Sequence, residues 1–207
     1  MDLANFVLFF LAAVAIAVSP GPGIFYVAAR TLSGGRVEGL TSSVGTGFGG
    51  LVHVLAGAVG VSALVLASAE AFALLKIAGA AYLVWLGIKT IREERIVLDM
   101  RAEPTGARRA FREGIVVEAL NPKTAAFFLA FIPQFVDPAG SVALQFAVLG
   151  LISVTLNTLA DIGVAFMASS ARTALARRPR VIRRIREGSG LVICGLGATL
   201  AFARRPA

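Results

Sequence analysis

The sequence predicts an all-α integral membrane protein with six transmembrane helices. Uncharged apolar stretches recur along the whole chain, and most of the lysines and arginines lie in the gaps between them. A composition of 57% hydrophobic and 15% charged residues leaves too little polar surface to cover a soluble domain. Because a bilayer core takes about 20 apolar residues per helix, we expect one transmembrane domain over residues 1–207, with helices at 3–29, 40–67, 71–91, 114–136, 141–169 and 188–203.

The first segment, 3–29, contains a helix-start signal in its middle. Ser19 is a favoured N-cap, and Pro20 is favoured at the first helical position, where its missing N–H costs nothing. Gly21 and Pro22 weaken the helical backbone further. In a bilayer, the backbone groups freed by such a break need partners in the protein or in a wet cavity. We therefore expect a break here, with a role in transport.

The second segment, 40–67, carries Gly45, Gly49, His53 and Gly57 at four-residue spacing. These residues share one helix face, and the glycines let a neighbouring backbone approach closely. His53 is therefore expected to face protein, where an imidazole suits a proton relay or a hydrogen bond to substrate. A neutral histidine that ties two helices together is an equally good interpretation.

The third and sixth segments have fewer polar features. Lys76 lies near the outer end of 71–91, where its long side chain is expected to reach toward the headgroups. The sixth segment, 188–203, is shorter than a usual span, so we expect it to stand nearly upright, with the arginines at its ends reaching outward.

The fourth segment, 114–136, repeats the helix-start signal with Asn121 and Pro122. Glu118 and Lys123 flank this signal and offer opposite charges to a small ligand, although a structural ion pair between them is an alternative. Breaks in the first and fourth of six helices predict two inverted three-helix repeats, which is a transporter architecture. A pair of purely structural kinks is the competing interpretation.

The fifth segment, 141–169, places Asn157 and Asp161 one turn apart on one face. A charge at that depth in a membrane is costly, so Asp161 is expected to face a cavity or a cation.

The distribution of basic residues predicts the orientation. The loops between the first and second, third and fourth, and fifth and sixth segments hold most of the lysines and arginines. The positive-inside rule places these loops in the cytoplasm and both termini outside it. A net charge of +8 does not predict nucleic acid binding here, because basic clusters beside membrane helices ordinarily face anionic lipid.

The polar groups of the segments fit a zwitterionic ligand. Helix N-termini at the two breaks, together with Lys123, would attract a carboxylate, while Asp161 and Glu118 would attract an ammonium group.

The sequence contains no G-x-S-x-G, no H-E-x-x-H and no phosphate-binding loop, so we expect neither an enzyme nor a cofactor. A cation or metal exporter that uses Asp161, Glu118 and His53 is a weaker alternative, because hard-cation sites generally need several carboxylates. A structural membrane subunit would leave the paired breaks unexplained.

Several stretches resemble the lysine exporter superfamily, closest to its homoserine and threonine exporter branch. They are Pro20-Gly21-Pro22-Gly23, His53, the stretch from Lys76 to Gly87, and Asn121-Pro122-Lys123 followed by Pro133-Gln134-Phe135. The resemblance covers nearly the whole chain. Two departures concern Asn157, where members often carry an aspartate, and Glu118, where an asparagine is frequent.

The resemblance implies a multi-pass exporter in a bacterial inner membrane that moves small amino acids and is driven by the proton gradient. A homo-oligomer is compatible with it, and no metal is implied. The residues expected to contact substrate are Pro20, Gly21, Pro22, Asn121, Pro122, Lys123, Gln134 and Asn157. Those expected to couple transport to protons are His53, Asp161 and Glu118.

Overall fold

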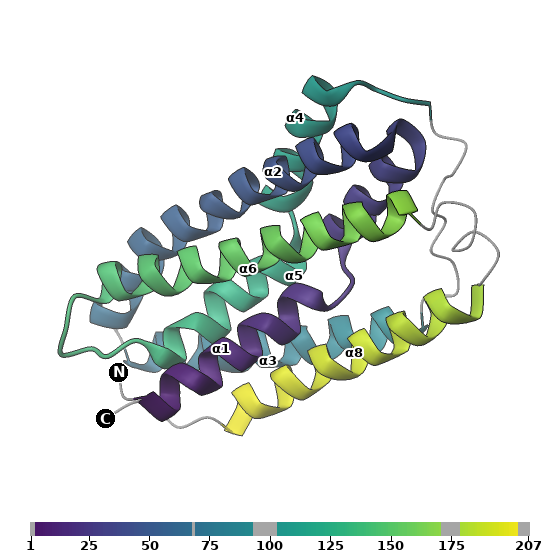
Figure 1. Ribbon diagram of the computed structural model, residues 1–207. Coiled ribbons are helices and arrows are strands. Elements are labelled where there is room, and N and C mark those ends of the chain that lie inside the picture. The colour runs from purple at the N-terminus through teal and green to yellow at the C-terminus, as the bar shows by residue number, and fades with distance from the viewer. Residues whose placement is uncertain (1–2, 68, 93–102, 171–178, 203–207) are drawn as a thin grey trace.

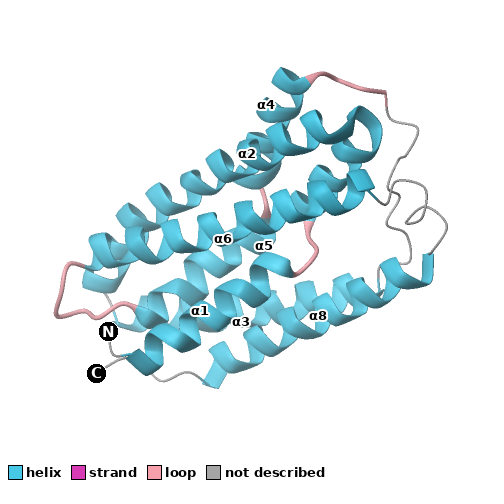
Figure 2. Cartoon of the chain, viewed as in Figure 1, coloured by secondary structure: helices cyan, strands magenta, loops and turns pink. Residues whose placement is uncertain are grey.

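A computed structural model describes residues 3–67, 69–92, 103–170 and 179–202, and every regular element within these ranges is a helix. The long helices lie side by side along one direction (Figure 1, Figure 2). The start of α1 and the end of α8 lie at the same end of the bundle (Figure 1). The all-helical prediction is therefore confirmed.

Several helices have the length and composition to cross a membrane. Three single helices are long and apolar enough to do so: Pro22–Gly60, Ala73–Arg92 and Val142–Ser170. A fourth is the pair Ala107–Ala119 and Pro122–Phe135, whose parts are bent by 40°. Two more apolar helices, Leu3–Val18 and Gly190–Thr199, are shorter. The described part of the chain thus contains three or four candidate spans and two short apolar helices.

The first break is present, but the helices around it differ from those expected. Helix α1 covers Leu3–Val18, and α2 covers Pro22–Ala67. The new helix thus begins at Pro22 rather than at Pro20, and it continues through the expected loop at 30–39. Gly35 bends it, with φ 78° and ψ −171°, a conformation open mainly to glycine. The chain turns back within α2 (Figure 1), so the part before the bend extends α1 and the part after it forms the second helix of the bundle.

The fourth segment is broken where the sequence predicts. Helix α4 covers Ala107–Ala119 and α5 covers Pro122–Ala126; a π-helical turn, η1 (Phe127–Phe131), and a 3-10 turn, η2 (Ile132–Phe135), follow. The Asn121 side chain caps α5 by accepting a hydrogen bond from the backbone N–H of Lys123 at 3.0 Å. The expected start at 114 is too late, because hydropathy locates the apolar part of a helix and α4 begins in a basic stretch.

The remaining helices are α3 (Ala69–Arg92), α6 (Val142–Ser170) and α8 (Pro179–Phe202). The first two begin and end close to the expected residues. Helix α8 has 24 residues and begins at Pro179 rather than at 188, so the helix is longer than its apolar segment. That segment is short, as Gly190–Thr199 shows, and its upright orientation stays a prediction. The first turns of α8 are basic, and a proline at the first helical position favours a helix start there.

Helix α2 packs closely against α4 on the expected glycine face. A side chain at Gly45 would collide with the carbonyl oxygen of Phe111, and one at Gly49 would collide with that of Ile115. From the other side, a Cβ at Gly114 would lie 2.7 Å from the carbonyl oxygen of Ser42. The prediction of a close backbone approach along this face is confirmed, and it fixes where Glu118, near the end of α4, lies against α2.

Candidate functional site

The two helix breaks meet at Lys123, which is 4% exposed. Its ammonium group donates hydrogen bonds to the carbonyl oxygens of Ser19, at 2.7 Å, and Ile16, at 3.1 Å. Carbonyls at the end of a helix lose their helical partners, and a cation there also offsets the negative end of the helix dipole. The carbonyl groups at the first break thus receive hydrogen bonds from Lys123, a side chain just beyond the second break.

Glu118 joins the two sides of the second break. It lies in the last turn of α4 and is 1% exposed. Its Oε1 accepts a hydrogen bond from Thr124 at 2.6 Å, and its Oε2 accepts one from the Asn121 amide at 2.8 Å. A Cβ at Gly23 would lie 2.6 Å from Oε2, so Glu118 also lies against the first break.

The expected alternative, an ion pair between Glu118 and Lys123, is not formed. Ion pairs are formed instead between other described residues, Arg30 with Glu38 and Arg109 with Glu113. Lys123 has backbone partners instead, because the end of α1 presents its carbonyls directly to the ammonium group.

A small cavity of about 20 Å³ lies between these groups, room for about one water molecule. Of the residues predicted to contact substrate or protons, Glu118, Lys123 and Asn157 line it. Asn157 makes no side-chain hydrogen bond to any other described residue, so its amide is available to a ligand. The remaining lining residues are Ile16, Ala17, Thr46, Gly47, Gly50, Thr124, Phe127, Phe128, Ser153 and Val154.

Other predicted substrate contacts lie outside the cavity lining. Pro22 is exposed, while Pro20 and Gly21 are buried within the first break. Asn121 and Pro122 start α5 and therefore position Lys123. The Gln134 amide donates to the carbonyl oxygen of Ala130 at 3.3 Å, and its buried oxygen has no hydrogen-bond partner among the described residues.

Asp161 is fully buried beside the cavity, between α6 and α2. Its Oδ2 lies 2.7 Å from the hydroxyl oxygen of Thr46, which lines the cavity. Its Oδ1 is buried and has no hydrogen-bond partner among the described residues. The carboxyl group therefore does not line the cavity itself, but contacts Thr46, which does.

His53 connects α2 to the second break. Its Nε2 lies 2.9 Å from the backbone oxygen of Glu118, and its ring packs against Phe128 with centroids 5.6 Å apart. The cavity lining does not include it. This contact fits the interpretation in which His53 ties two helices together, and its role in proton coupling stays a prediction.

Sequence reasoning missed three hydroxyl groups of the cavity, those of Thr46, Thr124 and Ser153. Ser153 could have been predicted from the sequence, because it precedes Asn157 and Asp161 at four-residue spacing on α6. Thr46 could not, since only the packing of α2 against α6 brings it to Asp161.

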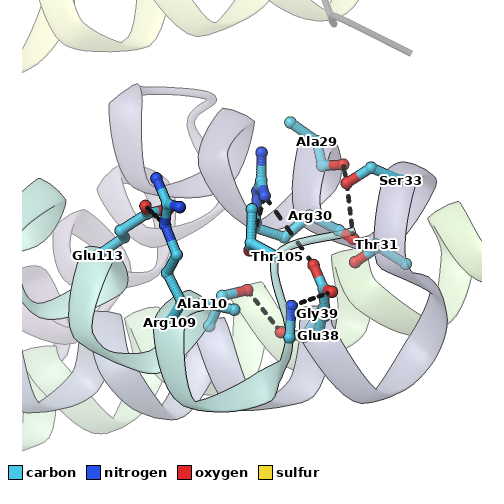
Figure 3. Close-up of polar contacts among 12 residues, drawn as sticks. Ala29, Arg30, Thr31, Ser33, Glu38, Gly39, Thr105, Arg109, Ala110 and Glu113 are labelled. Carbon is cyan, nitrogen blue, oxygen red and sulfur yellow. Dashed lines mark hydrogen bonds and ion pairs between the residues drawn. The ribbon is translucent and has the colours of Figure 1, made fainter. Parts of the chain in front are cut away.

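A second polar cluster lies near the bend of α2 (Figure 3). Arg30 donates to the Thr105 hydroxyl at 2.9 Å and lies 3.9 Å from the carboxylate of Glu38. Glu38 in turn accepts from the backbone N–H of Gly106 at 2.7 Å. These contacts hold the segment that precedes α4 against both arms of the bend.

We expect Glu38→Ala to destabilise the folded protein by about 3–5 kcal/mol, because it leaves the largely buried charge of Arg30 without its carboxylate. Thermal unfolding of the purified protein in one detergent measures this effect. Arg109→Ala, which removes the exposed ion pair with Glu113 on α4, is the control and should change little. Equal effects of the two changes would contradict a special role for the buried pair.

No three His, Cys, Asp or Glu side chains in the described ranges are grouped so that they could hold a metal ion. The acidic groups near the cavity instead have hydroxyl and amide partners.

Comparison with known proteins gives the family. The profile of the LysE type translocators matches residues 14–204. An uncharacterized membrane protein of Vibrio cholerae is 32% identical over 99% of this chain and 100% of its own length. The homoserine/homoserine lactone efflux protein of Salmonella typhimurium is 30% identical over 95% of each chain, and the leucine efflux protein of Klebsiella pneumoniae is 27% identical over 95% of this chain and 94% of its own. No solved structure matches. The match over most of the sequence and the apolar helices agree: this chain is a membrane transporter rather than an enzyme, and it belongs to the LysE type translocator family.

Proposed function

We propose that this protein exports small amino acids or their derivatives from the cytoplasm in exchange for protons. The observation that carries the proposal is the meeting of two broken helices around a cavity lined by one ammonium and one carboxylate group. Relatives named as homoserine/homoserine lactone and leucine efflux proteins support the substrate class.

The cavity groups match the two charges of an amino acid. Lys123 would bind the substrate carboxylate, and Glu118 would bind the ammonium group, with the Asn157 amide as a further hydrogen-bond partner. The aromatic and aliphatic part of the lining, which includes Phe127 and Val154, would contact the side chain. An amino acid needs far more room than one water molecule, so the helices must part before it enters.

The bonds between Lys123 and the end of α1 supply a means of opening. When substrate arrives, its carboxylate takes the place of the Ile16 and Ser19 carbonyls at the ammonium group. The released carbonyls are then hydrated or rearranged, which loosens the first break. Binding and opening would be linked because both use the same donor.

We assign six crossings to the chain in the membrane. The first consists of α1 with the part of α2 before the bend, and the second is the rest of α2. Helix α3, the broken helix from α4 to η2, α6 and α8 form the other four. Breaks in the first and fourth crossings, in contact with one another, support two inverted three-helix repeats.

The bend of α2 and the start of α4 carry arginines, including Arg36 and Arg108, and we assign them to the cytoplasmic face of a bacterial inner membrane. Both termini then lie outside the cytoplasm. Figure 1 supports this assignment, since α1 begins and α8 ends at the other end of the bundle.

Proton coupling is assigned first to Asp161 and then to Glu118 and His53. Buried ionisable groups within membrane helices commonly carry protons in transporters. The alternative, export of a metal ion, has less support, because the acidic groups of the described ranges do not gather into a metal-binding group.

The proposal is tested in proteoliposomes loaded with a panel of amino acids. An imposed pH gradient should accelerate release of at least one of them, and Asp161→Asn should remove this acceleration, because an amide cannot exchange a proton at neutral pH. Glu103→Gln, which changes an exposed carboxylate, should leave it intact. Release of a divalent metal ion, with no amino acid moved, would replace the proposal with the metal alternative.

A further inference from the structure

The Thr46 hydroxyl has more close oxygen neighbours than its single hydrogen can serve. Its oxygen lies 2.8 Å from the backbone carbonyl oxygen of Ser43 and 2.7 Å from Oδ2 of Asp161. A threonine hydroxyl donates once and accepts twice. If Asp161 were ionised, both neighbours would be acceptors, and one of the two contacts would be a repulsive approach of two oxygens.

A protonated Asp161 removes this conflict. Its Oδ2–H then donates to the Thr46 oxygen, and the Thr46 hydroxyl donates to the Ser43 carbonyl. Both distances are ordinary for hydrogen bonds between oxygens. Hydrogen-bond counting thus favours a neutral carboxylic acid in this conformation.

The surroundings of Asp161 favour the same state. The carboxyl group is 0% exposed, and its Oδ1 has no hydrogen-bond partner among the described residues. Two charged groups act on it from the neighbouring elements, Glu118 of α4 and Lys123 of α5. Glu118 is itself acidic, and the Lys123 ammonium donates to the end of α1 instead. Helix α2 contributes the Thr46 hydroxyl.

Helices α2 and α6 are tightly packed on either side of this contact. A Cβ at Gly39 would lie 3.1 Å from that of Ala165, and a Cβ at Gly47 would lie 2.7 Å from the Thr158 hydroxyl. An ionised carboxylate needs water or several donors, and the closed interface supplies one donor. Loss of the proton should therefore favour separation of α2 from α6.

We propose that Asp161 holds the transported proton in the closed state, that Thr46 is its positioning residue, and that release of this proton opens the interface between α2 and α6. The inference rests on the proposed proton-coupled export and specifies where the proton is held. Thr46 acts through its hydroxyl, so serine should replace it and valine, which has the same shape, should not.

Infrared difference spectroscopy tests the proton directly. The full-length protein in lipid nanodiscs at neutral pH should show the C=O band of a protonated carboxylic acid, and the band should shift in D₂O and vanish in Asp161→Asn. Thr46→Val should shift the band by removing its hydrogen-bond acceptor, whereas Thr46→Ser should keep it in place. No difference between the spectra of the wild type and Asp161→Asn in this band would overturn the inference.

A distance measurement tests the opening. Spin labels at Val44 of α2 and Leu159 of α6, both exposed, are introduced in a Cys194→Ala background. Raising the pH should shift the distance distribution toward longer values, at a lower pH in Thr46→Val than in Thr46→Ser. Asp161→Asn should remove the pH dependence, and an unchanged distribution in the wild type would contradict the coupling.

Neither measurement requires transport, so the two proposals can fail separately. If the Asp161 band is present in a protein that moves no amino acid, the proposed function is rejected, while the inference that protonated Asp161 is hydrogen-bonded to Thr46 stands. Proton-driven export without this band would do the reverse.

Discussion

Replacing Lys123 with methionine should raise the KM for export by about 10- to 100-fold, because one charge-assisted hydrogen bond is worth about 1.5–3 kcal/mol. Methionine keeps much of the length of the side chain and removes its charge. The carbonyls of Ser19 and Ile16 also lose the hydrogen bonds from the Lys123 ammonium group, so the first break should become less ordered. Uptake of substrate into inverted vesicles as a function of its concentration measures the change.

The matched control is Lys89→Met. Lys89 is an exposed lysine of α3 whose ammonium group lies over the Trp85 ring, 5.3 Å from its centroid. Its replacement should leave KM unchanged while removing the same charge from the protein. If Lys123→Met transports with the wild-type KM, Lys123 is a structural cap for α1 and the substrate carboxylate binds elsewhere.

Gly49→Ala should destabilise the protein by more than the roughly 1–3 kcal/mol that ordinary overpacking costs. The added methyl group would meet backbone as well as side chain: it would collide with the carbonyl oxygen of Ile115 and lie 2.8 Å from Cβ of Glu118. Backbone cannot change rotamer to make room, so α4 would have to move away from α2. Glu118 would move with it, and we expect export to be lost as well.

Gly60→Ala provides the control within the same helix. Gly60 is exposed, and a Cβ there would meet nothing within 4 Å. Alanine favours a helix over glycine by about 1 kcal/mol, so this variant should be as stable as the wild type or slightly more so. Thermal unfolding in the same detergent compares the two, and a shift of the same sign for both would show that close packing at Gly49 is unimportant.

Local chemistry explains what the sequence predicted well. Asn121 and Pro122 begin a helix because a side-chain acceptor and a missing N–H suit the first turn of any helix. The break around Ser19 and the glycine face at Gly45 and Gly49 follow from equally local properties. Helix ends were less predictable, because apolar residues mark only the apolar part of a helix, whereas α4 and α8 begin in basic stretches before it.

The sequence by itself determined the helical membrane class, the two breaks and the residues with ionisable side chains. Only the tertiary structure decided their partners. Lys123 meets Ser19 across 104 residues of chain, and Asp161 meets Thr46 across 115. No propensity or spacing specifies such pairs, because they depend on which helices pack together and at what depth. The close approach that glycines permit between α2 and its neighbours sets that depth, and it turns separate polar residues into one candidate transport site.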